Sequence, residues 1–221
     1  MFKKSFFAIT ALFTVITITY ACQPTTDKSQ SQADESPVNK KSLEGLQRAY
    51  FASGCFWCVE AVYESVKGVE EVYNGYAGGH TQNPTYEDSN TGTTGHAEAV
   101  EVYYDSTIVS FKELLDVYYG SQNIEQVNGQ GPDNGSQYRS IVFHQNENEK
   151  AIIDRKIQAL TAEGYIVASE VKPFEIFWMG EDYHQDYERL HPNQGYIRSV
   201  SIPRLQNFQA KYPELLKSNK H

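Results

Sequence analysis

The stretch "ASGCFWCVEAVYESV", from Ala52 to Val66, decides how the middle of this chain folds. It continues a strand-like segment, "QRAYFAS" (47–53), and from Cys55 onward its large apolar residues recur at helical spacing. Ser53 and Gly54 mark the place where one pattern gives way to the other. The sequence therefore predicts a strand that turns directly into a helix, with Cys55 at the turn and Cys58 one helical turn further on.

The segments that follow alternate between strand and helix patterns. Strand patterns are "VEEVYNGYAGG" (69–79), "AEAVEVYYD" (97–105), "YRSIVFH" (138–144) and "FEIFWMGE" (174–181), and helix patterns are "SFKELLDVYYG" (110–120) and "NENEKAIIDRKIQALTAEG" (146–164). Ser110 and Glu113 form a capping box, Gly164 closes the second helix, and Pro173 favours an edge position for the last strand. The order predicts an α/β (α+β) fold, a two-layer sandwich of a mixed β-sheet with packed helices.

Length and charge exclude some classes of partner. The chain has 221 residues, a formal net charge of −9 and a pI of about 5.2. This size favours one domain, or one domain plus a tail. The acidic balance argues against nucleic acid or an anionic membrane surface as the main partner.

The first residues, "MFKKSFFAITALFTVITITYAC", are typical of a signal peptide over 1–21. The apolar run is too short and too rich in threonine for a good membrane span. Its end resembles the lipobox of bacterial lipoproteins, which would make Cys22 the lipidated first residue, although Thr19 departs from that pattern. Ordinary secretion and a retained anchor helix are the alternatives. We expect an exported protein of the cell envelope, a lipoprotein that faces the periplasm.

The next segment, residues 22–43, is rich in Ser, Gln, Asp and Lys and has no aromatic residue. Such a composition buries too little apolar surface to offset the entropy of ordering. We therefore expect a flexible tether, which leads into a domain over 44–221.

Three interpretations of the cysteine pair compete. A thiol in the first helical turn meets unpaired backbone N–H groups and the positive end of the helix dipole, both of which favour thiolate. Cα atoms at this spacing are roughly 5 Å apart, within the range of a disulfide. The pair could instead be two inert buried cysteines, or half of a zinc site, although no second pair is present and the six histidines are scattered. Phe56 and Trp57 between the cysteines suit a redox site that grips a small apolar group beside the sulfur.

Longer motifs decide between these interpretations. The stretches "GCFWCVE", "GYAGGHTQNPTYEDSNTGTTGHAEAVEVYYD" and "QGPDNGSQYRSIVF" closely resemble those of A-type peptide methionine sulfoxide reductases, the MsrA family, from about Tyr50 to Tyr187. The resemblance implies an MsrA-like fold and reduction of the S epimer of methionine sulfoxide, free or in proteins. It also implies no bound cofactor, no metal and a monomer that uses an external thioredoxin-like dithiol reductant.

The chemistry that the resemblance implies begins with attack by the Cys55 thiolate on the sulfoxide sulfur. Methionine leaves and Cys55 becomes a sulfenic acid. Cys58 then condenses with this sulfenic acid to form a disulfide. Glu98, in "GHAEAV", would be the proton donor, and strand alternation places it on the inward face where burial raises the pKa of a carboxyl. Phe56 and Trp57 would form the cage for the S-methyl group. Outside this context, Glu98 would be assigned to an ion pair and the two aromatics to core packing.

Four further residues match motif positions. Tyr86 in "NPTYE" and Tyr138 in "GSQYRS" would hydrogen-bond the sulfoxide oxygen. Asp133 in "GPDNG" would complete the polar side, although this is also a strong turn signal. His184 in "EDYHQDY" matches a position near the site, with a structural role.

The chain departs from the common family pattern in two places. Gln122, Asn123 and Gly129 replace residues of the usual loop, and no cysteine follows Cys58, where many members recycle through cysteines near the C terminus. Cys58 is therefore the one mature thiol placed to act as partner of Cys55. A general dithiol oxidoreductase and a non-catalytic methionine-sulfoxide-binding protein stay open as alternatives.

Overall fold

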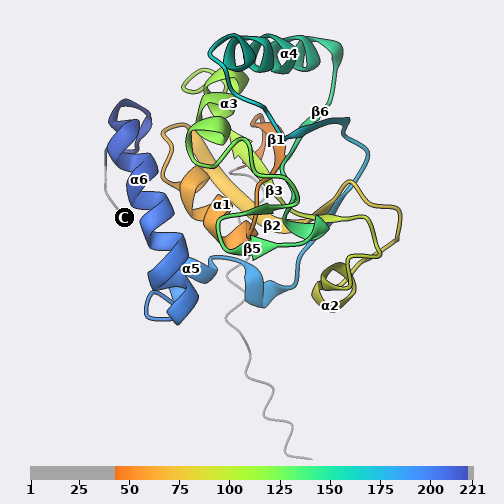
Figure 1. Ribbon diagram of the computed structural model, residues 1–221. Helices are drawn as coiled ribbons and strands as arrows, with labels where there is room; N and C mark the ends of the chain where they lie inside the picture. Colours follow the sequence, from red (N-terminus) through yellow and green to blue (C-terminus); the bar gives the residue numbers. More distant parts are fainter. Residues whose placement is uncertain (1–42, 219–221) are drawn as a thin grey trace, which may run out of the picture. The chain divides into compact units, whose positions relative to one another are not determined.

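A six-stranded mixed sheet forms the centre of the computed structural model, which describes residues 43–218 (Figure 1). The signal peptide, the lipidation site at Cys22 and nearly all of the tether lie outside the described residues. The strands run in the order β7-β6-β1-β3-β2-β8, with bounds Gln47–Ala52 for β1, Val69–Ala77 for β2, Ala97–Tyr104 for β3, Ile141–His144 for β6, Glu170–Pro173 for β7 and Phe177–Met179 for β8. Only β6 and β7 are paired in parallel, which confirms the predicted mixed sheet.

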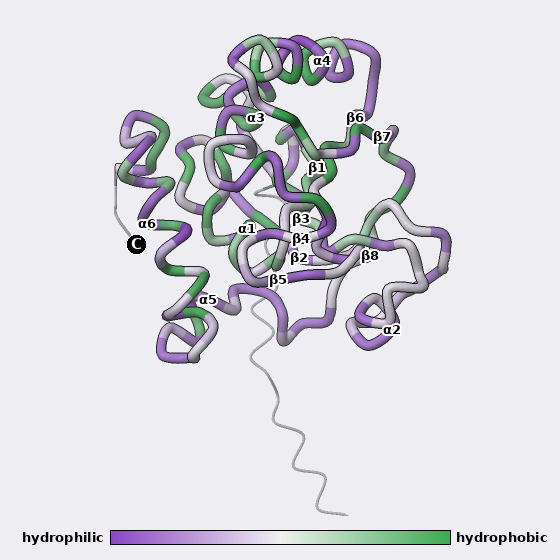
Figure 2. The backbone as a smooth tube through the Cα atoms, viewed as in Figure 1, coloured by the Kyte–Doolittle hydropathy of each residue, from purple (hydrophilic) through white to green (hydrophobic). Residues whose placement is uncertain are grey.

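Helices cover one face of this sheet. They are α1 (Phe56–Glu64), α3 (Phe111–Gly120), α4 (Glu147–Ala162) and α6 (Ile202–Lys211). Val100 and Val102 of β3 belong to the same core as Val62 of α1, Leu114 of α3 and Ile153 of α4, and each of these five residues is fully buried. Figure 2 shows hydrophobic and hydrophilic residues alternating along α4, as expected for a helix with one face on the core.

The opposite face carries a smaller core. Ala97 and Ala99 of β3 alternate with the valines and pack here with Tyr50, whose ring stacks on Phe174 with centroids 3.6 Å apart. The segment between β7 and β8 therefore covers this face with aromatic side chains in place of a helix. Among residues 43–218, none of the helices is long and apolar enough to cross a bilayer.

Short elements surround the sheet. They are α2 (Tyr86–Asn90), α5 (Tyr187–Leu190), a small β4–β5 pair (Gly129–Gln130 and Asp133–Asn134), 3₁₀ turns at Ser136–Tyr138, Asp182–His184 and Pro213–Leu215, and a π turn at Ile197–Ser201. The β4–β5 pair lies in the segment that departs from the common family pattern.

Local patterns predicted most of the elements, including the capping box at Ser110 and Glu113. The last strand, β8, lies at one edge of the sheet as expected, and Pro173 itself lies in β7 at the other edge. Helix α6 was not predicted, because most of its residues are polar and Phe208 is its one buried side chain.

The turn between β1 and α1 depends on Gly54. Its φ is +73°, a conformation that costs L side chains energy, and a Cβ there would lie 2.5 Å from the Cβ of Gln130. The Gly54 N–H donates to the carbonyl of Tyr138 at 3.1 Å. The chain can therefore reverse tightly and place Cys55 at the start of α1.

A buried carboxyl fastens α1 to a distant segment. Glu60 is 2% exposed and accepts a hydrogen bond from the backbone N–H of Asp186 at 2.9 Å. Burial raises the pKa of Glu60 to about 8. Hydrogen bonding from the backbone of Asp186 and from the side chain of Asn74 opposes this shift.

This arrangement predicts a pH-dependent stability that Glu60→Gln removes. The folded pKa lies above the ordinary value of 4.5, so the free energy of unfolding falls as pH rises from about 4.5 to about 8. The slope from this group is at most about 1.4 kcal/mol per pH unit. The glutamine of this variant is neutral in both the folded and the unfolded state. Urea denaturation is therefore expected to show that the free energy of unfolding of Glu60→Gln rises relative to that of the wild type as pH increases from about 5 to about 8. Parallel stability curves for the two proteins would show that Glu60 is ionised in the folded state.

Candidate active site

The two predicted thiols lie together at the start of α1. Cys55 is the N-cap residue and Cys58 lies in the first turn; they are 6% and 2% exposed, and both are free thiols. The turn after β1 sets their position, because Gly54 reverses the chain just before Cys55. The pair therefore sits beneath the surface, beside the sheet.

Two carboxyls face the first N–H groups of the helix. The backbone N–H of Phe56 donates to Oε2 of Glu98 at 3.0 Å. The backbone N–H of Cys55 lies close enough to Asp133 to lower the pKa of that carboxyl, although burial outweighs this and raises the pKa. The N–H groups that were expected to favour a Cys55 thiolate are thus shared with acidic side chains.

The surroundings of the two thiols shift their pKa values in opposite directions. Burial raises the pKa of the Cys55 thiol well above its usual range, and nearby Cys58 and Glu98 raise it further. The pKa of Cys58 is lowered, first by hydrogen bonding from the Cys55 thiol and then by the charge of Arg204. The hydroxyl of Tyr196 lies 3.7 Å from the Cys58 sulfur. The surroundings of Cys58 thus favour a thiolate more than those of Cys55 do.

Glu98 combines burial with closeness to the thiols. It is 2% exposed and lies on the face of β3 that carries Val100 and Val102, as strand alternation predicts. Burial raises its pKa to about 8, against the opposing effect of the Phe56 N–H. This carboxyl is therefore protonated at neutral pH and can donate a proton.

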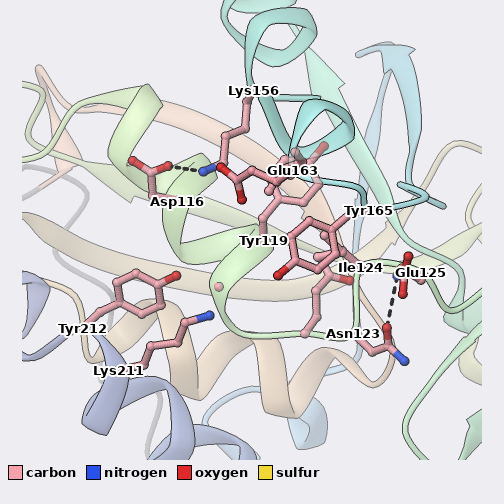
Figure 3. Close-up of a pocket in the computed structure, with 13 residues that line it drawn as sticks. Asp116, Tyr119, Asn123, Ile124, Glu125, Lys156, Glu163, Tyr165, Lys211 and Tyr212 are labelled. Carbon is pink, nitrogen blue, oxygen red and sulfur yellow. Dashed lines mark hydrogen bonds and ion pairs between the residues drawn. The ribbon is translucent and has the colours of Figure 1, made fainter. Parts of the chain in front are cut away.

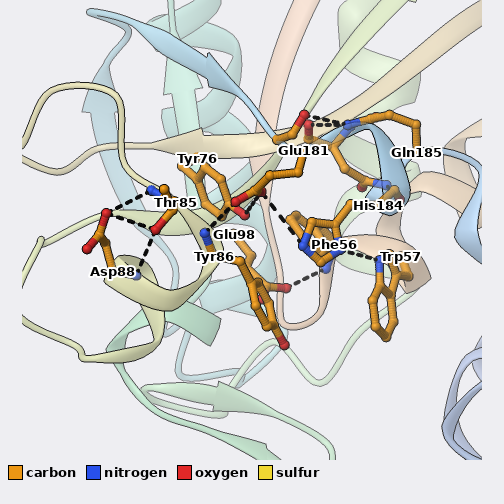
Figure 4. A network of polar contacts seen from close by, with 12 residues as sticks. Phe56, Trp57, Tyr76, Thr85, Tyr86, Asp88, Glu98, Glu181, His184 and Gln185 are labelled. Atoms are coloured by element: carbon orange, nitrogen blue, oxygen red, sulfur yellow. Dashed lines mark hydrogen bonds and ion pairs between the residues drawn. The ribbon is translucent and has the colours of Figure 1, made fainter. Parts of the chain in front are cut away.

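Aromatic rings form the apolar wall beside the thiols. Phe56 is buried, with its ring centroid 6.1 Å from that of Trp57 and 4.8 Å from that of His184. The indole of Trp57 stacks on Tyr187 at 3.8 Å and donates from Nε1 to Nδ1 of His184 at 3.2 Å (Figure 4). The half-buried indole is held from two sides and is available to a ligand.

The two predicted tyrosines come together from different elements. Tyr86 is the first residue of α2, and Tyr138 ends the 3₁₀ turn at Ser136–Tyr138. Their hydroxyls are close enough to affect each other's pKa, and burial raises the pKa of both, with Glu98 and Cys55 contributing. The structure thus gathers phenol hydroxyls, the Glu98 carboxyl and the Cys55 thiol in one region.

Asp133 takes a different position from the simple polar contact that the motif implies. Its Oδ2 accepts a hydrogen bond from the hydroxyl of Tyr196 at 2.6 Å, and Tyr196 also approaches Cys58. The sequence analysis missed Tyr196, which is one of 16 tyrosines and lies in no quoted motif. It also missed Arg204, whose guanidinium donates to the carbonyl and Oγ of Ser53 at 2.9 and 3.0 Å.

The unusual loop residues have a structural function. Oε1 of Gln122 accepts hydrogen bonds from Ser53 and Ser140, both at 2.8 Å, and from Gln130 at 3.2 Å. Gln130 in turn accepts from the backbone N–H of Asn123 at 2.9 Å. The residues that depart from the family pattern therefore form a set of polar contacts around the cysteine turn.

Cys58 also lines a groove of about 620 Å³ between residues 120–133 and the segment 199–211, which includes Arg204 and Lys211. A neighbouring hollow of about 300 Å³ lies among α3, α4 and α6, where Lys156 pairs with Asp116 at 2.7 Å (Figure 3). This hollow is lined by none of the predicted site residues. Within the described range 43–218, no three His, Cys, Asp or Glu side chains are grouped to hold a metal ion.

Comparison with known proteins assigns the chain to a family. Residues 47–216 match the family model described as peptide methionine sulfoxide reductase. The chain belongs to this family. It is 43% identical to peptide methionine sulfoxide reductase MsrA of Saccharolobus solfataricus over 173 residues, which cover 78% of this chain and 98% of that protein. It is 45% identical to the MsrA of Nautilia profundicola over 175 residues, 79% of this chain and 99% of that protein.

A solved structure agrees with the fold. Methionine sulfoxide reductase A of Corynebacterium diphtheriae superposes with a TM-score of 0.63 at 33% identity, over 68% of this chain and 77% of that one. The MsrA-like architecture expected from the sequence is thereby confirmed. The individual roles of the site residues remain predictions.

The protonated state of Glu98 predicts a pH-dependent rate. As pH rises through about 8, the proton is lost and the rate of sulfoxide reduction falls. Glu98→Gln keeps the shape but removes the proton, and we expect the rate to drop by about 10²–10⁴-fold, the usual effect of a positioned acid. Single-turnover kinetics from pH 6 to pH 10 would measure both effects. A variant with wild-type rates at neutral pH would exclude Glu98 as the donor.

Proposed function

We propose that this peptide methionine sulfoxide reductase reduces the S epimer of methionine sulfoxide, free or in proteins, to methionine. One observation carries the proposal: the protonated Glu98 carboxyl bonds to the N–H of Phe56, directly after Cys55 in the chain. A proton donor and a sulfur nucleophile thus lie on either side of one peptide unit. The half-buried Trp57 adds an apolar surface for a methyl group.

The first step forms a bond from the Cys55 sulfur to the sulfoxide sulfur. Cys55 passes its proton to Cys58 as it attacks, which the opposite pKa shifts of the two thiols favour. The sulfoxide oxygen accepts a proton from Glu98, with Tyr86 and Tyr138 placed to donate hydrogen bonds to it. The oxygen is transferred as hydroxyl to Cys55, which becomes a sulfenic acid, and methionine leaves with both electrons of the former sulfur–sulfur bond.

Cys58 completes the cycle. Its sulfur attacks the sulfenic sulfur of Cys55, a disulfide forms, and the hydroxyl leaves as water after taking up a proton. A thioredoxin-like dithiol then reduces the disulfide by thiol–disulfide exchange. The groove that Cys58 lines supports this step, since it gives an incoming thiol a route to that sulfur.

A chiral assay with cysteine variants tests this function. Dabsylated methionine-S-sulfoxide is expected to be reduced with dithiothreitol, while the R epimer is not. Cys55→Ser is expected to abolish turnover. Cys58→Ser should still release one methionine per enzyme in a single burst and leave a dimedone-reactive sulfenic acid, because attack at the sulfoxide sulfur does not require a disulfide. The burst should be slower than in the wild type, because the Cys55 proton has lost its acceptor. With thioredoxin as reductant this variant should stop after that burst, whereas dithiothreitol should still support turnover.

Two outcomes would contradict the proposal. Normal cycling of Cys58→Ser with thioredoxin would show that Cys58 is an ordinary helix residue. Reduction of insulin disulfides without any reduction of the sulfoxide would indicate a general dithiol oxidoreductase, and binding without turnover would indicate a binding protein.

We further propose that the protein is exported and acts as a monomeric lipoprotein of the cell envelope, with Cys22 as the lipid-bearing residue. The basic and apolar regions of 1–21 and the "TYAC" ending support this, and the polar segment 22–43 supplies a tether long enough to hold the domain away from the lipid.

Cys22→Ser tests the lipid anchor. The wild type is expected in the membrane fraction with a mature mass that includes lipid, because acyl chains partition into the bilayer. The variant should appear as a soluble exported form or an unprocessed precursor. Intact-mass analysis of each fraction shows where the protein is found and whether it carries lipid. Light scattering of the soluble form measures its molar mass, which is expected to be that of a monomer. Recovery of unlipidated wild type wholly in a soluble fraction would exclude the anchor.

A further inference from the structure

One buried and one half-buried polar side chain connect both walls of the site. We propose that Glu181 and His184 are positioning residues: Glu181 sets the tautomer of His184, and His184 holds the Trp57 indole in its working orientation. The same carboxylate holds the start of α2 and with it Tyr86. This inference rests on the proposed function, because it assigns these residues to the two surfaces that would bind the sulfoxide.

The indole of Trp57 is restrained at one edge and on one face. Its Nε1–H donates to Nδ1 of His184 at 3.2 Å, and Tyr187 stacks on it at 3.8 Å with an interplanar angle of 8°. Stacking alone lets an indole slide or turn in its own plane. The hydrogen bond removes that freedom, so the orientation of Trp57 depends on an acceptor at Nδ1.

The tautomer of His184 follows from its neighbours. The side chain is 1% exposed, and burial lowers its pKa, so the ring is neutral at pH 7. Indole Nε1–H can only donate, so Nδ1 must be the unprotonated nitrogen and the proton must lie on Nε2. Nε2 has no hydrogen-bond partner among the described residues, and Oε2 of Glu181 lies 3.8 Å from it. The negative carboxylate favours the Nε2–H form over the other tautomer.

Both oxygens of Glu181 are in use (Figure 4). Oε1 accepts the backbone N–H of Tyr86 at 2.8 Å, and Oε2 accepts the hydroxyl of Tyr76 at 2.7 Å besides facing His184. A carboxylate offers two acceptor oxygens here, whereas an amide would turn an NH₂ group toward Tyr76, His184 or the N–H of Tyr86. The contacts therefore favour an ionised acid at this position.

The His184 ring transmits these constraints to both walls. Its centroid lies 4.8 Å from that of Phe56 and 4.7 Å from that of Tyr86, so it fills the space between the apolar cage and the tyrosine side. A shift of this ring would move the methyl-binding and oxygen-binding surfaces relative to each other. Displacements of a few tenths of an ångström at such a site are costly to binding and rate.

The backbone around His184 is itself firmly held. The side chain of Asn74 donates to the carbonyl of His184 at 2.8 Å, and Gln185 bonds to both the N–H and the carbonyl of Asn74 at 2.8 and 3.0 Å. Asp186 is bound to Glu60 of α1. The segment is thus a rigid platform, which is what a positioning role requires.

A double-mutant cycle isolates the proposed bond. His184→Phe keeps a ring but removes the acceptor, and we expect the substrate concentration for half-maximal single turnover to rise about 3–10-fold, the usual worth of one hydrogen bond. The saturating rate should change much less. In a Trp57→Phe background, where no indole N–H exists, His184→Phe should have little further effect. His184→Asn, which keeps an acceptor near the place of Nδ1, should restore part of the affinity.

A readout without substrate accompanies the kinetics. In ¹⁵N–¹H spectra, the Nε1–H of Trp57 should exchange slowly with water in the wild type and rapidly in His184→Phe. If His184→Phe weakens binding equally in both backgrounds, or leaves the exchange unchanged, the ring is only a packing element and the inference is wrong. If the wild type fails to reduce methionine sulfoxide while the exchange effect is present, the proposed function fails and the bond itself stands.

Glu181→Gln tests the second half of the inference, with exposed Glu175→Gln as the matched control. The Glu181 variant is expected to speed indole exchange and to lower both affinity and the saturating rate, because Tyr86 loses its anchor as well. Glu175→Gln should match the wild type. A Glu181 variant with wild-type exchange and kinetics would overturn the role of the carboxylate.

Discussion

The hydrogen bond from the Phe56 N–H to Glu98 is the constraint on which the site depends. It joins the start of α1 to the centre of the sheet and uses a helix N–H that would otherwise be unpaired. It can form only because the turn at Gly54 brings the helix start back over β3. Burial of the carboxyl follows from the same geometry, and burial keeps Glu98 protonated at neutral pH. The contact thus fixes the position of the proposed acid, while burial sets its protonation state against the effect of the contact.

Burial and the carboxyls at the start of α1 also shift the pKa values of the two thiols. Carboxyls beside the first N–H groups of α1 leave little of the helix end free to stabilise a Cys55 thiolate, and burial opposes charge there. Cys58 faces Tyr196, Arg204 and the groove, and therefore holds the charge more easily. In the proposed mechanism, Cys58 accepts the Cys55 proton from one helical turn away.

The segment from Glu181 to Tyr187 explains how an aromatic cage can be placed accurately on a short helix. It contributes little to the sheet, yet it contacts β2, α1 and α2 through side chains and backbone. The residues that would touch the substrate are thereby supported by others that do not. Buried polar groups in this segment are mostly paired, which makes the network rigid and intolerant of partial loss.

The sequence alone determined strands β1, β2, β3, β6 and β8, helices α1, α3 and α4 and the cysteine turn, because hydrophobic periodicity, capping residues and glycine act over a few neighbours. Its motifs also named Cys55, Glu98, Tyr86 and Tyr138, which the fold brings together. Only the tertiary structure decided in which direction the pKa of each thiol shifts, how Tyr196 and Arg204 surround Cys58, and where the mostly polar α6 packs. These properties arise from burial and from contacts between residues more than a hundred positions apart, and no local pattern encodes desolvation or long-range proximity.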